Sequence, residues 1–189
     1  LAVDVSARIA EQVAAGSLGA ALVESEVAGP YLEVRARFED ELFVVTPPQL
    51  RPADGRAFSA EEALALRQIA REPASLSRRL VEATLARAGL PYSPVMELGH
   101  IETIKKAVEA GLGVSLLSGF VVADEVRSGR LGAWRMHGVP FRRVLTLLSR
   151  GGDTASPATA AFLALARAEQ AAGTAVPAQL SPPAQSDQP

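Results

Sequence analysis

The sequence predicts an α/β protein in which strands and helices alternate along the chain. The clearest evidence is a strand–helix–strand unit at 97–118. Four apolar side chains recur there at helical spacing, namely Ile101, Ile104, Val108 and Leu112. Gly111 and Gly113 then permit a left-handed helix C-cap and a sharp turn into the apolar strand 114–117. Because this alternation continues along most of the chain, we expect a mostly parallel sheet covered by helices.

The first half of the chain is predicted to begin with a strand and a helix. Ser6 is placed to cap a helix that runs to about Ala15 and is closed by Gly16. Apolar or alternating runs predict four strands, at 1–5, 19–23, 32–38 and 42–46. Ser59 and Glu62 have the spacing of a capping box, which predicts a short helix after residue 59.

The second half repeats the same alternation. Apolar runs predict strands at 68–70, 95–98, 131–136 and 144–148. Helical patterns are found at 77–88 and 120–127, and Ser156-Pro157 opens a long alanine-rich helix to about Ala172. The tail 173–189 is rich in proline and has no aromatic residue, so we expect it to be disordered.

Composition excludes several classes of protein. The 189 residues suffice for one sizeable core or two small lobes, and the net charge of −2 does not suit a stand-alone nucleic-acid binder. The chain has no cysteine, so disulfides, zinc–thiolate sites and thiol catalysis are excluded. No apolar run approaches membrane-spanning length. Since the first residue is Leu1 and not methionine, we expect the chain to be part of a larger protein.

Five motifs occur in the order found in the effector-binding domain of LysR-type transcriptional regulators. They lie at 13–24 (V-x-x-G-x-L-x-x-A-L-V-E), 41–47, 71–78 (R-E-P-x-S-x-S-R), 97–118 (including V-x-x-G-x-G), and 143–150 with 157–165. Together they cover most of the chain from Leu1 to Ala172. The chain therefore resembles that family.

The resemblance implies a two-lobed, type 2 periplasmic-binding-protein-like fold, with Rossmann-like lobes joined by two crossing strands and a ligand cleft between them. Lobe one would comprise 1–45 plus 144–172, and lobe two 46–143. We expect the family's helix-turn-helix and its first strand–helix unit to be missing from this chain.

The best candidate for binding is the segment 72–78, where a helix begins. Ser75 and Ser77 supply hydroxyl groups and Arg78 supplies a cation, beside the free N–H groups and positive dipole end of a helix. Such a helix start suits a carboxylate, a sulfate or a phosphate. The alternative is that one serine only caps the helix, and the resemblance favours a residue that does both.

A second candidate is the turn Gly99-His100-Ile101, which faces the cleft in the family that the chain resembles. The alternative, favoured for His100, is a surface histidine without a partner. A Glu102–Lys106 pair at i,i+4 is expected on the same helix. Lys105 and Lys106 are expected to form a solvated face.

The resemblance adds four further residues, each with a plainer alternative. Ser6 opens the helix after the first strand, where family members often contact ligand, but it is equally suited to be a cap. Thr46 and Pro47 are expected where the crossing strand enters lobe two, or are simply a strand end. Ser118 ends the strand 114–118, or is a turn residue.

The function implied by the resemblance is that of an effector-sensing domain of a bacterial DNA-binding transcription regulator, which binds a small, anionic metabolite. It would act in the cytoplasm as a homodimer or homotetramer and reach promoter DNA only through the missing helix-turn-helix. We expect no membrane contact, no metal, no cofactor and no enzymatic activity, because no acid–base or nucleophilic constellation is evident. The alternative is an extracytoplasmic solute-binding protein of a transporter, which has the same architecture.

Overall fold

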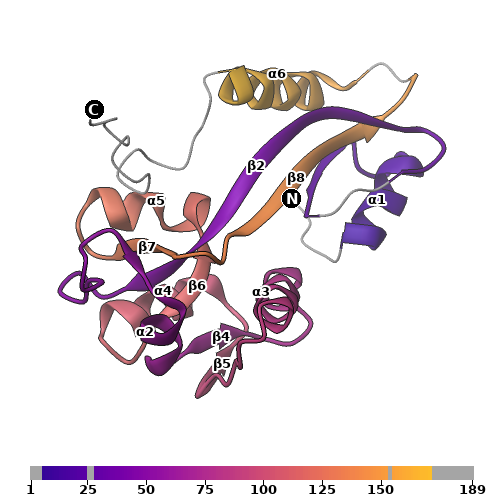
Figure 1. The fold of residues 1–189 in the computed structure, drawn as a ribbon. Helices are drawn as coiled ribbons and strands as arrows, with labels where there is room; N and C mark the ends of the chain where they lie inside the picture. Colours follow the sequence, from indigo (N-terminus) through magenta and orange to yellow (C-terminus); the bar gives the residue numbers. More distant parts are fainter. Residues whose placement is uncertain (1–5, 25–27, 153–154, 172–189) are drawn as a thin grey trace, which may run out of the picture. The chain divides into compact units, whose positions relative to one another are not determined.

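The computed structural model describes residues 6–24, 28–152 and 155–171, which form two compact units (Figure 1). Unit 1 takes the described residues up to Asp40 and those from Arg143 onwards, and unit 2 runs from Glu41 to Arg142. Two long strands, β2 (Leu32–Thr46) and β8 (Phe141–Arg150), are neighbours in the sheet. Each of these two strands continues from one unit into the other.

In unit 1, helices pack on both faces of a small sheet. Strand β1 (Ala20–Val23) pairs with β8 in antiparallel fashion, and β8 lies next to β2. Helix α1 (Ser6–Ala14) packs one apolar cluster against Val23 and Leu148. Helix α6 (Pro157–Ala171) packs a second cluster against Leu147 through Leu163. Leu147 and Leu148 are consecutive in β8 but belong to different clusters. Because side chains alternate between the faces of a strand, α1 and α6 cover opposite faces of this sheet.

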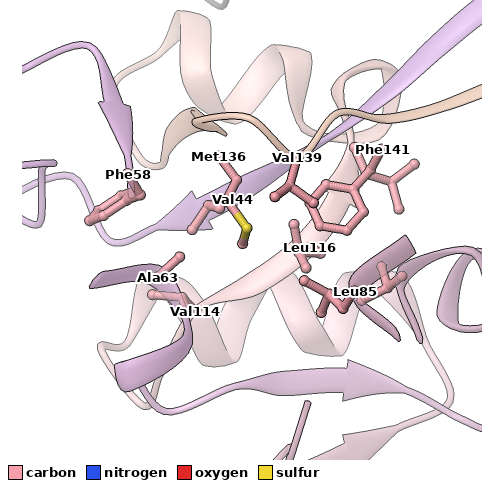
Figure 2. Packing of buried hydrophobic residues seen from close by; sticks show 11 residues of the cluster. Val44, Phe58, Ala63, Leu85, Val114, Leu116, Met136, Val139 and Phe141 are labelled. Atoms are coloured by element: carbon pink, nitrogen blue, oxygen red, sulfur yellow. The ribbon is translucent and has the colours of Figure 1, made fainter. Parts of the chain in front are cut away.

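Unit 2 contains the remaining elements, whose bounds are β3 (Ala57–Phe58), α2 (Ala60–Ala65), β4 (Ile69–Arg71), α3 (Leu76–Arg87), β5 (Met96–Leu98), α4 (Ile101–Glu109), β6 (Ser115–Ser118), α5 (Gly119–Arg127) and β7 (Gly132–Met136). Figure 2 shows how the side chains of Val44, Leu116 and Met136 converge from three strands on one core. A second cluster buries Ile104 and Val108 of α4 against Phe43 and Ile69.

The sheet is mixed, so the prediction of a mostly parallel sheet is wrong. Strand β2 runs antiparallel to both β6 and β7, and β1 runs antiparallel to β8. Parallel pairing is found between β3 and β7, between β4 and β5, and at a bridge from Gln68 to Val114. Each of these antiparallel pairs includes β2 or β8, the two long strands that pass between the units.

Most predicted elements are confirmed. The capping box of Ser59 and Glu62 is present, with both reciprocal hydrogen bonds. Ser156 caps α6 by accepting the N–H of Thr159 at 3.2 Å. The predicted strands 32–38 and 42–46 form one continuous strand, β2. The predicted strand 1–5 and the tail 173–189 lie outside the described residues.

Within the described ranges, none of the helices combines the length and the apolar character needed to cross a lipid bilayer.

Candidate functional site

Three helices of unit 2 begin at the same edge of neighbouring strands. Strands β4 and β5 are parallel, with Arg71 opposite Leu98, and the parallel bridge from Gln68 to Val114 aligns β6 with them. The carboxyl ends of these strands therefore share one edge, and α3, α4 and α5 are the elements that follow β4, β5 and β6 along the chain. In α/β folds such an edge is where small ligands bind, and helix N-termini favour anions.

Gly113 permits this alignment. A Cβ atom at this position would collide with the carbonyl oxygen of Arg67, which is backbone and has little freedom to move. The N–H of Val114 donates to that same carbonyl at 2.9 Å. The glycine that the sequence marked as a turn residue thus lets β6 approach the start of β4.

At the N-terminus of α3, Ser75 is the N-cap residue but its side chain makes no capping hydrogen bond. Its backbone N–H donates to the carbonyl of Glu72 at 3.0 Å, which closes the loop before the helix. Ser77 lies in the first turn of α3 and is half-buried. The first turn therefore presents N–H groups that the Ser75 hydroxyl does not cap.

Arg78 is buried, with 7% of its surface exposed, and its charge is balanced by the protein. Its Nε donates to Glu82 Oε1 at 2.6 Å, and its Nη2 lies 3.4 Å from Glu97 Oε1. Its Nη1 donates to the carbonyl of Arg71 at 3.2 Å. The guanidinium also lies 5.0 Å from the ring centre of Tyr92, and burial raises the pKa of Tyr92 to about 12. Arg78 thus ties α3 to β4 and β5.

The partners of Arg78 are only partly visible in the sequence. Glu82 stands four residues after Arg78 on the same helix, which is a spacing that brings side chains together. That spacing was the available signal. Glu97 and Tyr92 come from outside the helix, and no local pattern links them to it.

At the N-terminus of α4, His100 is the N-cap residue and also makes no side-chain capping bond. Gly99 and His100 are exposed and Ile101 is half-buried. Two hydrogen bonds from Arg71, at 2.9 and 2.8 Å, lower the pKa of the Glu72 carboxyl, and His100 makes a smaller contribution to the same shift.

Ser118 caps α5, where its Oγ accepts the N–H of Phe120 at 3.2 Å. It therefore completes the row of helix starts in unit 2. Ser6 belongs to unit 1 and is the first residue of α1. Its Oγ accepts the N–H of Glu24 at 3.2 Å, which joins the start of α1 to the residue after β1.

The structure does not bring Thr46 and Pro47 together with these residues. Strand β2 enters unit 2 at Glu41, and its Leu42 lies opposite Ser118. Thr46 therefore lies near the start of β6, at the other end of that strand. Its hydroxyl donates to the carbonyl of Leu50 at 2.9 Å and accepts from Trp134 Nε1 at 3.1 Å, and it is fully buried.

The prediction that Lys105 and Lys106 form a solvated face of α4 holds for Lys106 and is wrong for Lys105. Lys106 is exposed and pairs with Glu109 at 2.6 Å, not with Glu102. Lys105, in contrast, is buried, with its Nζ 3.0 Å from Glu125, 2.8 Å from Glu102 and 3.2 Å from the carbonyl of Val121. It joins α4 to α5 behind the edge.

Across the part of the chain that the structure describes, no group of three or more metal-ligating side chains comes together.

These features define a small-molecule-binding domain of mixed α/β architecture. Residues 1–171 match the model of the LysR substrate binding domain, and the chain belongs to that family. The predicted family and fold class are thereby confirmed, since solved LysR regulatory domains have the two-lobed, type 2 periplasmic-binding-protein-like fold.

Solved structures with similar folds include regulatory domains of transcription regulators. The CcmR regulatory domain of Synechocystis PCC6803 in complex with 2-PG superposes with a TM-score of 0.70 at 22% identity, covering 88% of this chain and 80% of that chain. The effector binding domain of QuiR in complex with shikimate gives a TM-score of 0.66 at 16% identity, covering 88% and 79%.

Curated relatives are longer proteins. A probable RuBisCO transcriptional regulator of Cyanidium caldarium is 32% identical over 82% of this chain and 51% of its own length. The regulator CbbR of Xanthobacter flavus is 38% identical over 60% of this chain and 35% of its own length. A phosphonates import ATP-binding protein PhnC of Anaeromyxobacter dehalogenans is 32% identical over 87% of this chain, but over only 33% of its own length. The chain thus spans about a third to a half of these relatives.

Proposed function

We propose that this chain is the effector-sensing part of a bacterial LysR-type transcriptional regulator. The observation that carries this proposal is the family match over residues 1–171, together with relatives that are regulators of transcription. In the longer protein, a helix-turn-helix would read promoter DNA and this domain would report a metabolite. The regulator would act in the cytoplasm as a homodimer or homotetramer, without catalysis. The alternative of a transporter's solute-binding protein is not favoured by these relatives.

The ligand that fits the edge of unit 2 is a small anion. Three helix N-termini supply N–H groups and positive dipole ends at the edge, with the hydroxyls of Ser75 and Ser77 beside them. The buried cations Arg78 and Lys105 are already paired with carboxylates. Neutral donors therefore recognise the ligand, and 2-PG and shikimate, which similar domains bind, are the first compounds to test.

Binding would control transcription by shifting a conformational equilibrium. A ligand shifts an equilibrium between two conformations of the regulator only by the difference between its affinities for them. The edge of unit 2 must therefore bind the anion more tightly in one conformation of the regulator than in the other.

The experiment that tests the site is calorimetric titration of the 189-residue chain with 2-PG and shikimate, before and after Ser77→Asp. A carboxylate in the first turn of α3 suits the helix dipole, and the thermal midpoint of the variant reports separately what loss of the Ser77 hydroxyl costs the fold. The same carboxylate should repel an anionic ligand and weaken its binding at least about tenfold. Ser93→Asp makes the same change in an exposed loop and should leave affinity unaltered. Equal affinity in the Ser77→Asp variant would place the site elsewhere.

A further inference from the structure

Thr146 of β8 has a buried hydroxyl that makes no hydrogen bond to the described residues. The residue is 2% exposed, and among the described residues its Oγ1 has no hydrogen-bond partner. Burying a hydroxyl without a partner costs free energy, and such groups are uncommon in folded proteins. Valine has nearly the same shape and would fill this position without that cost.

The strand register shows which face of the sheet Thr146 occupies. Thr146 lies opposite Val23, and Leu148 lies opposite Ala21. Val23, Ala21 and Leu148 all belong to the cluster that α1 covers, whereas Leu147 packs towards α6. Since side chains alternate along a strand, Thr146 faces α1.

The start of α1 lies at the same end of β1. Ser6, the first residue of α1, accepts the N–H of Glu24, which directly follows Val23. The hydroxyl of Ser6 keeps its own hydrogen to donate. The first N–H groups of α1 have no acceptor within the helix, as at every helix start. Two hydroxyls and a helix N-terminus therefore flank the carboxyl end of β1.

We propose that Thr146 is an effector-contacting residue that donates a hydrogen bond to a carboxylate or phosphate oxygen, in a unit 1 subsite shared with Ser6 and the first turn of α1. The proposal rests on the proposed sensing function and adds a residue that no sequence motif marks. Arg143, a cation on the same strand as Thr146, is paired with Glu24 at 2.8 Å and with Asp40 at 2.7 Å. The subsite thus recognises its ligand through neutral donors.

The test is a titration of isotope-labelled chain with inorganic phosphate, followed by backbone NMR signals. Phosphate should shift the signals of Ser6, Ala7 and Thr146 in the unaltered chain. Thr146→Val should weaken that response about fivefold, and Thr146→Ser, which keeps the hydroxyl, should restore most of it. The thermal midpoint of Thr146→Val without phosphate should be unchanged or raised, because a buried unsatisfied hydroxyl has been removed.

Two results would overturn the proposal. One is a phosphate response at Ser6 that Thr146→Val leaves intact, or no response there at all. The other is a clear loss of stability in Thr146→Val, which would mean that the hydroxyl has a structural partner such as a buried water. Because the signals are residue-specific, loss of the response in unit 1 is separable from failure of the edge in unit 2, which the Ser77→Asp titration reports.

Discussion

The two units differ in how a buried polar side chain is satisfied in each. In unit 2, Arg78 is buried against Glu82, Glu97 and a backbone carbonyl, so its donors serve the fold. In unit 1, Thr146 is buried and no described residue satisfies it. A buried charged side chain in unit 2 is thus satisfied by the protein itself, whereas a buried neutral hydroxyl in unit 1 is not.

Two ion pairs form where β2 passes from unit 1 to unit 2. Asp40 and Glu41 are consecutive in β2 and therefore point to opposite faces of the strand. Asp40 binds Arg143 at 2.7 Å within unit 1, and Glu41 binds Arg135 at 2.9 Å within unit 2. Each unit thus anchors its own end of β2 with an arginine.

The largest effect is expected from Gly113→Ala, which attacks the alignment of strands in unit 2. The new Cβ would strike the carbonyl oxygen of Arg67, and backbone strain should cost about 3 kcal/mol of stability. Gly99→Ala is the matched control, because a Cβ there has open space, and it should cost less than about 0.5 kcal/mol. Urea unfolding of both variants measures this. Equal midpoints would mean that β6 does not need the close approach.

The next effect is that of Arg78→Met, which leaves two carboxylates and a carbonyl without their shared cation. Removing one member of a buried ion pair costs about 3–5 kcal/mol, but Glu82 and Glu97 are about half exposed, so about 2 kcal/mol is expected here. Arg79→Met is the control, since Arg79 is exposed and makes one bond at 3.3 Å to a carbonyl. If Arg78→Met unfolds at the same urea concentration as Arg79→Met, Arg78 is available for ligand, as the sequence first suggested.

Sequence patterns predicted the elements well because those depend on neighbours in the chain. The capping box of Ser59 and the apolar face of α4 are both set within a few residues. The patterns failed where a partner is distant in sequence. Lys105 was expected in solvent because its partner Glu125 lies 20 residues further on.

Long-range pairing also decided which candidate residues come together. Thr46 was grouped with the binding residues, but the pairing of Leu42 with Ser118 moves it to the far end of β6. Thr146, which we propose as a ligand contact, has no sequence signal, because only strand pairing reveals a hydroxyl facing α1. Register between strands is a property of the tertiary fold that no local pattern reports.

A smaller effect, about 1 kcal/mol, is expected from Lys105→Met. The methionine keeps the buried stem of the side chain, but Glu125 loses its hydrogen bond at 3.0 Å. Lys106→Met, one residue later, removes only an exposed ion pair and should change stability by less than about 0.5 kcal/mol. Thermal unfolding of the two variants compares a buried with an exposed lysine on one helix. Equal losses would contradict the role of Lys105 in joining α4 to α5.

The smallest effect is a pH dependence of stability that Lys105 creates. Burial alone would raise the pKa of Glu125, but the hydrogen bond and charge of Lys105 outweigh it, and the pKa of the Glu125 carboxyl is lowered from 4.5. A carboxyl whose pKa is lower in the folded state contributes stability above its unfolded pKa, and that stability is lost as the pH falls through the folded pKa. The chain should therefore lose stability below about pH 4.5, by less than about 1 kcal/mol from this group.

In Lys105→Met this part of the loss should vanish, while Lys106→Met should keep it. Urea unfolding at pH 6 and pH 4 measures the difference, and identical pH slopes in all three proteins would show that another carboxylate governs acid sensitivity.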